Sequence, residues 1–87
     1  MLDRKFRGKS AWRMVIDVIG NTCLRCGDTQ GKITRDHIVP LASGGANNIG
    51  NCQPLCVECN YRKGLDVADY RTPALKQFIE YLSDIKR

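Results

Sequence analysis

Apolar residues recur at helical spacing in two segments, one near each end of the chain. The first segment, residues 11–19, carries four of them on one face: Trp12, Val15, Ile16 and Ile19. Their i, i+3, i+4, i+7 spacing predicts an amphipathic helix whose stripe packs in the core. Ser10 is the expected N-cap of this helix, and Gly20 is expected to end it.

The second segment, residues 72–86, has the clearer helical signature. Thr72 is placed to cap it, and Pro73 occupies its first position. Its apolar face comprises Leu75, Phe78, Ile79, Leu82 and Ile85. Lys86 and Arg87 add positive charge at the carboxyl end, where the helix dipole favours it. We expect this helix to pack against the first one.

The middle of the chain predicts two short strands and one short helix. Pro40 ends the first strand, and Gly64 stops the helix. The predicted elements are a strand over 32–39, a loop over 42–50, a short extended segment over 53–55 and a helix over 57–63. Strands and helices mixed in this way predict an α+β fold.

The chain has 87 residues, which is short for a domain that relies on its apolar core alone. Chains of this size bury only roughly 60–65% of the surface that their unfolded forms expose, so small domains commonly add a metal, a disulfide or a partner. We interpret residues 1–87 as one domain, with residues 1–9 as a basic arm. The opening residues do not resemble a secretory leader, and no apolar run approaches the roughly 20 residues of a membrane span. A cytoplasmic protein, neither secreted nor bound to a membrane, is expected.

Four of the five cysteines form two Cys-x-x-Cys pairs: Cys23, Cys26, Cys56 and Cys59. Outside a secretory context, this spacing favours a metal over disulfides. A tetrahedral Cys₄ zinc site has no open position, which predicts a structural ion rather than a catalytic one. An iron–sulfur cluster takes the same ligands, and a redox dithiol needs only one pair, so both remain alternatives. Cys52 is left over, and we expect it to be buried as an apolar residue.

The net charge of +5 and the pI near 9.1 are typical of proteins that bind nucleic acid. A solvated basic surface explains these values equally well. The positive charge is concentrated near the N-terminus and within the middle of the chain, at Arg4, Lys5, Arg7, Lys9, Arg13, Lys32, Arg35, Arg62 and Lys63.

Four side chains without sulfur lie among the cysteines: Asp36, His37, Asn51 and Asn60. Oxygen donors beside an imidazole suit a hard divalent ion and a general base, although a single histidine can also pack in a core. The order of residues is more specific: Asp36-His37-Ile38-Val39-Pro40, Gly44-Gly45, Asn51, Leu55-Cys56-x-x-Cys59-Asn60 and Lys63-Gly64. Over residues 23–64 this run resembles the HNH endonuclease family, and the two flanking helices lie outside it.

The resemblance implies a ββα-metal unit, in which a hairpin with a long loop precedes a helix and a Cys₄ zinc braces both. It implies that His37 is the general base and that Asn51 holds the hairpin loop. Asp36 and Asn60 match the ligands of a divalent ion. The last position is Asn rather than His, as in His-Asn-Asn variants of the family, which favours Mg²⁺ or Mn²⁺. Since neighbours in a strand face opposite sides, Asp36 and His37 can serve one site only where the strand bends or ends.

The implied activity is metal-dependent hydrolysis of phosphodiester bonds in DNA, with nicking favoured for a monomer or weak dimer. Arg35, Arg62 and Lys63 are candidates for contacting phosphates, or else belong to a solvated face. Similar stand-alone proteins often belong to phages and act beside DNA-packaging (terminase) proteins, which are therefore candidate partners in a phage-infected cell. The alternative function is a zinc-stabilised DNA-binding module with weak or no catalysis, and no motif distinguishes DNA from RNA.

Removal of the thiolate-bound metal is expected to unfold the domain. Structural zinc contributes about 10–16 kcal/mol in small sites at neutral pH, whereas the net stability of a domain is about 5–15 kcal/mol. Far-UV circular dichroism during titration with a strong chelator should lose its helical signal as metal is released, and added zinc should restore it. A helical spectrum that persists after complete metal removal would contradict this prediction.

Overall fold

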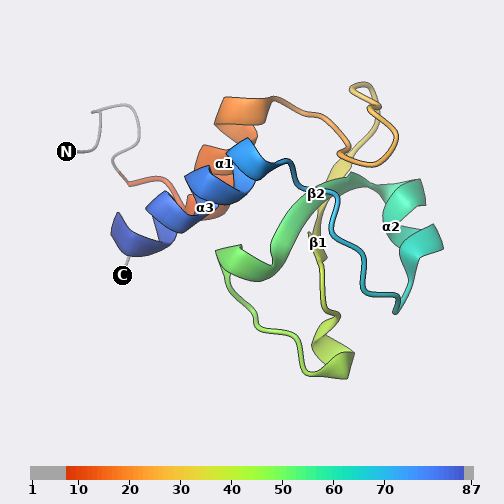
Figure 1. Ribbon diagram of the computed structural model, residues 1–87. Coiled ribbons are helices and arrows are strands. Elements are labelled where there is room, and N and C mark those ends of the chain that lie inside the picture. Colours follow the sequence, from red (N-terminus) through yellow and green to blue (C-terminus); the bar gives the residue numbers. More distant parts are fainter. Residues whose placement is uncertain (1–7, 86–87) are drawn as a thin grey trace.

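The computed structural model describes residues 8–85. A two-stranded antiparallel sheet lies at the centre, with α1 and α3 packed together on one side and α2 on the other (Figure 1). The elements in chain order are α1 (Ala11–Ile19), β1 (Ile33–His37), the 3-10 turns η2 (Leu41–Ser43) and η3 (Ile49–Asn51), β2 (Cys52–Cys56), α2 (Val57–Lys63) and α3 (Pro73–Ile85). The α+β class is confirmed, and the hairpin followed directly by α2 forms the expected ββα unit.

The register of the hairpin shows which residues lie at each end of the ββα unit. Strand β1 pairs with β2 from Ile33 opposite Cys56 to His37 opposite Cys52. All five residues of β2 are buried, including the polar Gln53. Because alternate side chains of a strand point to opposite sides, burial at five successive positions means that both faces of β2 are covered. The strand therefore forms the centre of the unit.

Apolar packing is divided between two clusters that share one residue. The cluster between α1 and α3 consists of Met14, Val15, Leu75, Ile79 and Leu82. The cluster at the other end of the hairpin consists of Cys23, Leu55, Cys56 and Cys59. Leu24 packs against both, and its N–H donates to the Pro54 carbonyl at 3.0 Å. Leu24 thus joins the helical pair to the hairpin.

Helix α1 has the predicted bounds, but its buried face differs from the predicted stripe. Met14 and Val15 are fully buried, whereas Trp12 and Ile16 are only half-buried. The predicted stripe did not include Met14. Trp12 lies beneath the Arg35 guanidinium, whose carbon is 5.6 Å from the ring centroid. The indole thus makes a cation–π contact with Arg35 and is not part of the cluster between α1 and α3.

Helix α3 begins at Pro73, and Thr72 Oγ1 accepts a hydrogen bond from the Leu75 N–H at 3.1 Å. This bond confirms the predicted cap. The packing of α3 against α1 is also confirmed, since Leu82 at their contact is 0% exposed. Ile85, the last apolar position of the helix, is 37% exposed and adds little to the core.

Two expectations concern residues outside the described range. Most of the basic arm, residues 1–9, and the charges of Lys86 and Arg87 fall there. Within residues 8–85, the structure contains no helix that is both long and apolar enough to cross a membrane.

Truncation of Leu82 is expected to test the packing of α3. Leu82→Ala leaves a cavity between two helices and should lower the free energy of unfolding by about 2–5 kcal/mol. Ile85→Ala, one turn further along, should cost less than about 1 kcal/mol because Ile85 is partly exposed. Chemical denaturation of the zinc-loaded proteins measures both, and equal losses would contradict the packing described.

Candidate active site and metal centre

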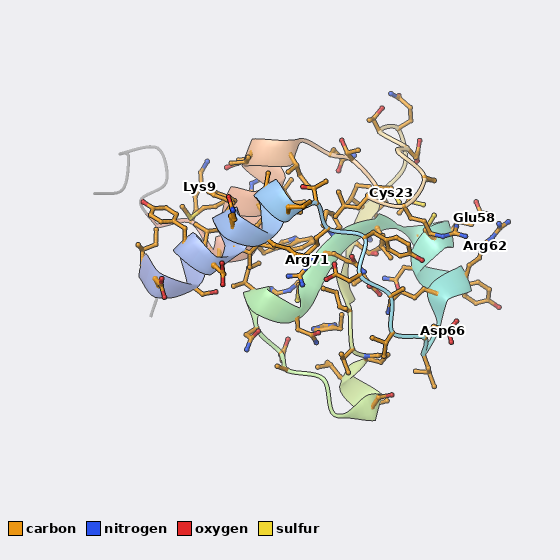
Figure 2. All side chains as sticks on the ribbon, in the orientation of Figure 1. Lys9, Cys23, Glu58, Arg62, Asp66 and Arg71 are labelled. Atoms are coloured by element: carbon orange, nitrogen blue, oxygen red, sulfur yellow. The ribbon has the colours of Figure 1, made fainter. Side chains whose placement is uncertain are left out.

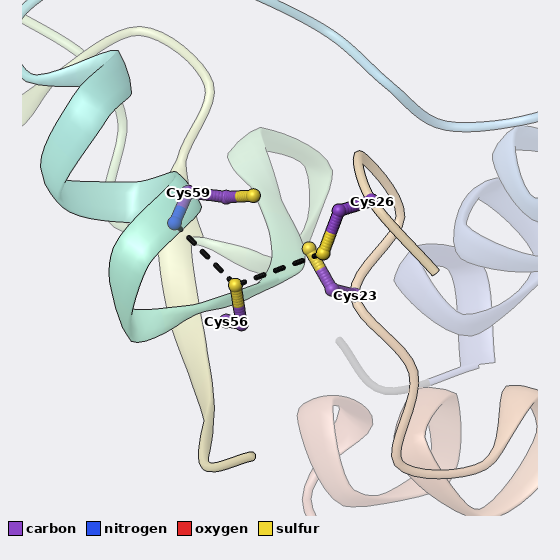
Figure 3. A group of neighbouring side chains, drawn as sticks. All are labelled: Cys23, Cys26, Cys56 and Cys59. Atoms are coloured by element: carbon purple, nitrogen blue, oxygen red, sulfur yellow. Dashed lines mark hydrogen bonds between the residues drawn. The ribbon is translucent and has the colours of Figure 1, made fainter. Parts of the chain in front are cut away.

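Four cysteines from two separate parts of the chain converge on one point. Cys23 and Cys26 flank the tight turn before β1, Cys56 ends β2, and Cys59 lies in the first turn of α2. Figure 3 shows the two pairs facing each other, and all four sulfur atoms lie within 4.8 Å of one another. Among the described residues, this is the only cluster of three or more His, Cys, Asp or Glu side chains with that geometry.

The spacing of these sulfur atoms fits a zinc ion. Cys26 Sγ and Cys56 Sγ are 3.9 Å apart, close to the ~3.8 Å edge of a tetrahedron with Zn–S bonds of about 2.3 Å. Cys56 Sγ also accepts the Cys59 N–H at 3.4 Å and so caps the start of α2. Arg25 Nη1 donates to Cys59 Sγ at 3.6 Å from outside the cluster. Such an outer donor orients a thiolate ligand and offsets its charge.

The thiols of the cluster differ in acidity. Burial raises the pKa of the Cys23 thiol, but surrounding backbone N–H groups, first that of Cys26, lower the pKa to about 6. The Asp28 N–H lowers the pKa of the Cys26 thiol, yet the Cys23 sulfur and desolvation raise the pKa to about 12. Cys23 therefore loses its proton readily, whereas loss of a second proton from the neighbouring Cys26 is unfavourable. A divalent cation among the sulfur atoms would remove this penalty.

A second group of polar side chains lines a shallow pocket at the other end of the hairpin. The pocket has a volume of about 270 Å³ and is lined by Arg35, Asp36, His37, Pro40, Leu41, Ala42, Asn60, Gly64 and Leu65. Three of the four residues predicted for the hard site, Asp36, His37 and Asn60, therefore meet there. His37 is the last residue of β1, and the end of the strand at this point allows two neighbours to line one pocket.

The Asp36 carboxylate is buried and engaged by two partners that the sequence analysis did not place there. Gln53 Nε2 donates to Asp36 Oδ2 at 2.9 Å, and Lys63 Nζ lies 3.4 Å from Oδ1. The Lys63 side chain is only 1% exposed, and its ammonium also donates to the His37 carbonyl at 3.0 Å. The ammonium of Lys63 is thus engaged within the protein, and its contact with a phosphate stays a prediction.

The His37 ring is oriented by a residue of the hairpin loop. His37 Nε2 lies 3.1 Å from Asn47 Oδ1. An amide oxygen only accepts hydrogen bonds, so with this orientation Nε2 carries the proton and Nδ1 is the basic nitrogen. Asn47 is one of several asparagines in a loop rich in turn-forming residues, and nothing in the sequence singled it out.

Asn51 fastens the long connection between the strands. Its Oδ1 accepts the Val39 N–H at 3.0 Å, while its Nδ2 donates to the carbonyls of Val39 at 2.9 Å and Ala46 at 2.8 Å. Its own carbonyl accepts from Ile38 N. Gly45 lies so close that a Cβ there would be 1.8 Å from the Val39 carbonyl oxygen. Asn51 thus lies away from the pocket lining and holds the chain directly after His37.

Asn60 reaches the pocket from α2. Its Nδ2 donates to Thr34 Oγ1 at 2.7 Å, and Thr34 Oγ1 donates to the Leu55 carbonyl at 2.8 Å. Because the amide nitrogen is engaged by β1, the amide oxygen is the atom left to bind a further partner. The same bond fixes α2 against the hairpin.

The two remaining basic candidates differ in position. Arg35 lines the pocket, and its Nε donates to Cys52 Sγ at 3.1 Å. Cys52 is buried, as expected. Arg62 lies on the exposed side of α2, where Arg62 Nη2 is 2.7 Å from Glu58 Oε1 (Figure 2). Of these two arginines, only Arg35 adjoins His37.

Gln53 could have been found from the sequence with a correct strand register. It lies directly opposite Asp36 in the hairpin, and residues in that position contact each other across an antiparallel pair. Its amide also binds the segment after α2, since Nε2 donates to the Ala68 carbonyl at 2.7 Å and Oε1 accepts from Tyr70 N at 2.8 Å. No local pattern predicts these contacts.

Comparison with known proteins gives the family of this site. Residues 23–65 match the family described as HNH endonuclease. This part of the chain belongs to that family. The HNH domain thus spans the Cys₄ cluster, the hairpin, the pocket and α2, while α1 and α3 lie outside it.

A curated relative and the solved structures add little to this assignment. The chain is similar to "Anaredoxin" from Nostoc sp. (strain PCC 7120), with 29% identity over 63 residues, which are 70% of this chain and 83% of that protein. No solved structure matches the chain significantly.

Replacement of Asn51 is expected to loosen the hairpin loop. Asn51→Ala removes three side-chain hydrogen bonds and leaves Val39 partly unsatisfied, which should lower stability by about 2–4 kcal/mol. Asn48→Ala is the matched control, because the Asn48 side chain forms no capping bond in η3. Hydrogen exchange should accelerate at Val39 and through residues 40–50 in Asn51→Ala alone. Unchanged exchange in this segment would contradict the role described.

Proposed function

We propose that the protein is a metal-dependent endonuclease that hydrolyses phosphodiester bonds in DNA, with nicking as its basic activity. The observation that carries this proposal is that Asp36 and His37 from the end of β1 and Asn60 from α2 line one pocket. This pocket lies within the stretch that belongs to the HNH endonuclease family. Each residue has the chemistry that phosphodiester hydrolysis requires.

The donors at the pocket suit a hard divalent ion. Asp36 offers a carboxylate oxygen and Asn60 an amide oxygen, and such ligands favour Mg²⁺ or Mn²⁺. When bound, the ion supplies positive charge that stabilises the developing charge on phosphate and leaving-group oxygens. Asp36 and Asn60 would hold it. The Cys₄ zinc has no open coordination position and serves only the fold.

His37 is proposed as the general base. An imidazole changes its protonation state near neutral pH and can accept a proton from the attacking water. Asn47 Oδ1 accepts the proton on Nε2 and leaves Nδ1 basic. Asn51 and Lys63 act on the backbone rather than the ring: Asn51 fastens the chain after His37, and Lys63 binds the His37 carbonyl. General-base assistance of this kind contributes about 10²–10⁴ in rate.

Arg35 is the proposed contact for the phosphate next to the scissile bond. It adjoins Asp36 and His37 in the pocket lining. Arg62 is proposed to contact the DNA backbone further away, in exchange for its exposed pair with Glu58. The net charge of +5 supports binding to an anionic polymer and predicts that it weakens with salt. One pocket in a chain of this size favours cutting one strand per encounter.

One observation favours a second candidate function, a zinc-stabilised DNA-binding module with weak or no catalysis. Both oxygens of Asp36 have protein partners, and the carboxylate is 4% exposed. A ligand held in this way binds a divalent ion less readily than an open carboxylate does. The two candidates differ in whether cleavage appears with added metal.

Conversion of supercoiled plasmid to open circles tests the proposal. Wild-type protein, His37→Ala and the exposed-site control Gln77→Ala are compared with Mg²⁺, Mn²⁺ or no added divalent ion, after equal zinc content is confirmed for all three. Wild type and Gln77→Ala should nick only with divalent metal, and His37→Ala should be slower by about 10²–10⁴.

Two outcomes would reject the nuclease. Cleavage by His37→Ala at the wild-type rate would remove His37 from the reaction. If all three proteins bind DNA and none cleaves it with either metal, the DNA-binding module is the correct function.

A further inference from the structure

A buried ion pair includes Asp36, one of the residues that line the pocket. The side chains of Lys63 and Asp36 are 1% and 4% exposed, and Lys63 Nζ is 3.4 Å from Asp36 Oδ1. Gln53 Nε2 donates to the second oxygen at 2.9 Å. Among the described residues, every buried side-chain nitrogen and oxygen has a partner. The pair is therefore fully satisfied without any added ion.

The distances show which contact fixes the ammonium. A charged N–H···O bond is normally about 2.7–2.9 Å long, so the 3.4 Å contact with Asp36 is loose, whereas the bond to the His37 carbonyl at 3.0 Å is closer to normal. Lys63 is thus anchored by the end of β1 and lies beside the carboxylate as its counter-charge. The bond to the His37 carbonyl does not involve Asp36.

We propose that Lys63 is a resident cation of the hard site, which neutralises Asp36 before a divalent ion binds and thereby lowers the affinity for that ion. This inference rests on the proposed function, since it takes Asp36 as a ligand. A carboxylate is small, so a second cation on Asp36 lies near the ammonium and is repelled by it. Lys63 also positions His37 through the backbone, so that the base is held even when the ion is absent.

Thermal unfolding of zinc-loaded protein, titrated with MgCl₂ at constant ionic strength, tests this role. The variants are Lys63→Met, Asp36→Asn, the double variant Lys63→Met/Asp36→Asn, and the control Lys32→Met at an exposed position. All variants are titrated in the same buffer at the same pH. Lys63→Gln, which keeps a donor for the His37 carbonyl without the charge, serves in place of Lys63→Met if that variant does not fold.

Without Mg²⁺, Lys63→Met should unfold at a lower temperature than wild type, because it leaves a buried carboxylate without its cation. The double variant should recover part of this loss, since both charges are then removed. With Mg²⁺, Lys63→Met should gain more stability than wild type, with an apparent Kd lower by about tenfold. Lys32→Met should match wild type, and neither Asp36→Asn variant should respond.

The outcomes separate this inference from the proposed function. Suppose that Mg²⁺ stabilises wild type but not Asp36→Asn, and that the Kd of Lys63→Met for Mg²⁺ is equal to or higher than that of wild type. Lys63 is then only structural, and the inference is overturned while the metal site stands. If Mg²⁺ raises the unfolding temperature of no protein in a way that Asp36→Asn abolishes, both the metal site and the inference fail. A Kd for Mg²⁺ that is lower in Lys63→Met, or in Lys63→Gln where that variant replaces it, but unchanged in Lys32→Met supports the resident cation.

Discussion

The convergence of four sulfur atoms from two distant turns is the constraint on which the rest of the structure depends. Two strands and three short helices bury too little apolar surface to fix their own arrangement. The cluster joins the turn at Cys23 and Cys26 to the end of β2 and the start of α2. A metal on these thiols would contribute free energy comparable to the whole stability of a small domain.

The cysteine cluster also affects the pocket at the other end of the hairpin, because α2 connects the two. Cys56 caps the helix and Cys59 lies in its first turn, so the direction of α2 is set by the sulfur cluster. Asn60 and Lys63 belong to the same seven-residue helix and meet β1 from it, at Thr34 and at the His37 carbonyl. The sulfur cluster thus positions two side chains of α2 against β1. If a metal on these thiols holds the fold, its removal is expected to disrupt the pocket as well.

The interior around β2 contains polar and charged side chains. Gln53, Asp36 and Lys63 are buried together, and their satisfied contacts avoid the penalty of unpaired charge. The same contacts join three segments, since Gln53 binds the chain at Ala68 and Tyr70 as well as β1. A domain with apolar residues at these positions could be equally stable. It would lack the charged end of the hairpin on which the proposed chemistry depends.

Local signals in the sequence were enough to predict the helices and the cysteine cluster. Helical periodicity, the glycine stops and the Thr72 cap predicted α1, α2 and α3. The spacing of the cysteines predicted that Cys23, Cys26, Cys56 and Cys59 cluster. The buried faces and the contacts between polar groups depend on how the elements pack in three dimensions. Met14 is buried in the helical cluster although the predicted stripe contained Trp12 instead, and Lys63 is buried beside Asp36. Lys63 and the His37 carbonyl are 26 positions apart in the chain, and the burial of Met14 depends on the rotation of α1 against α3, so no local pattern encodes either one.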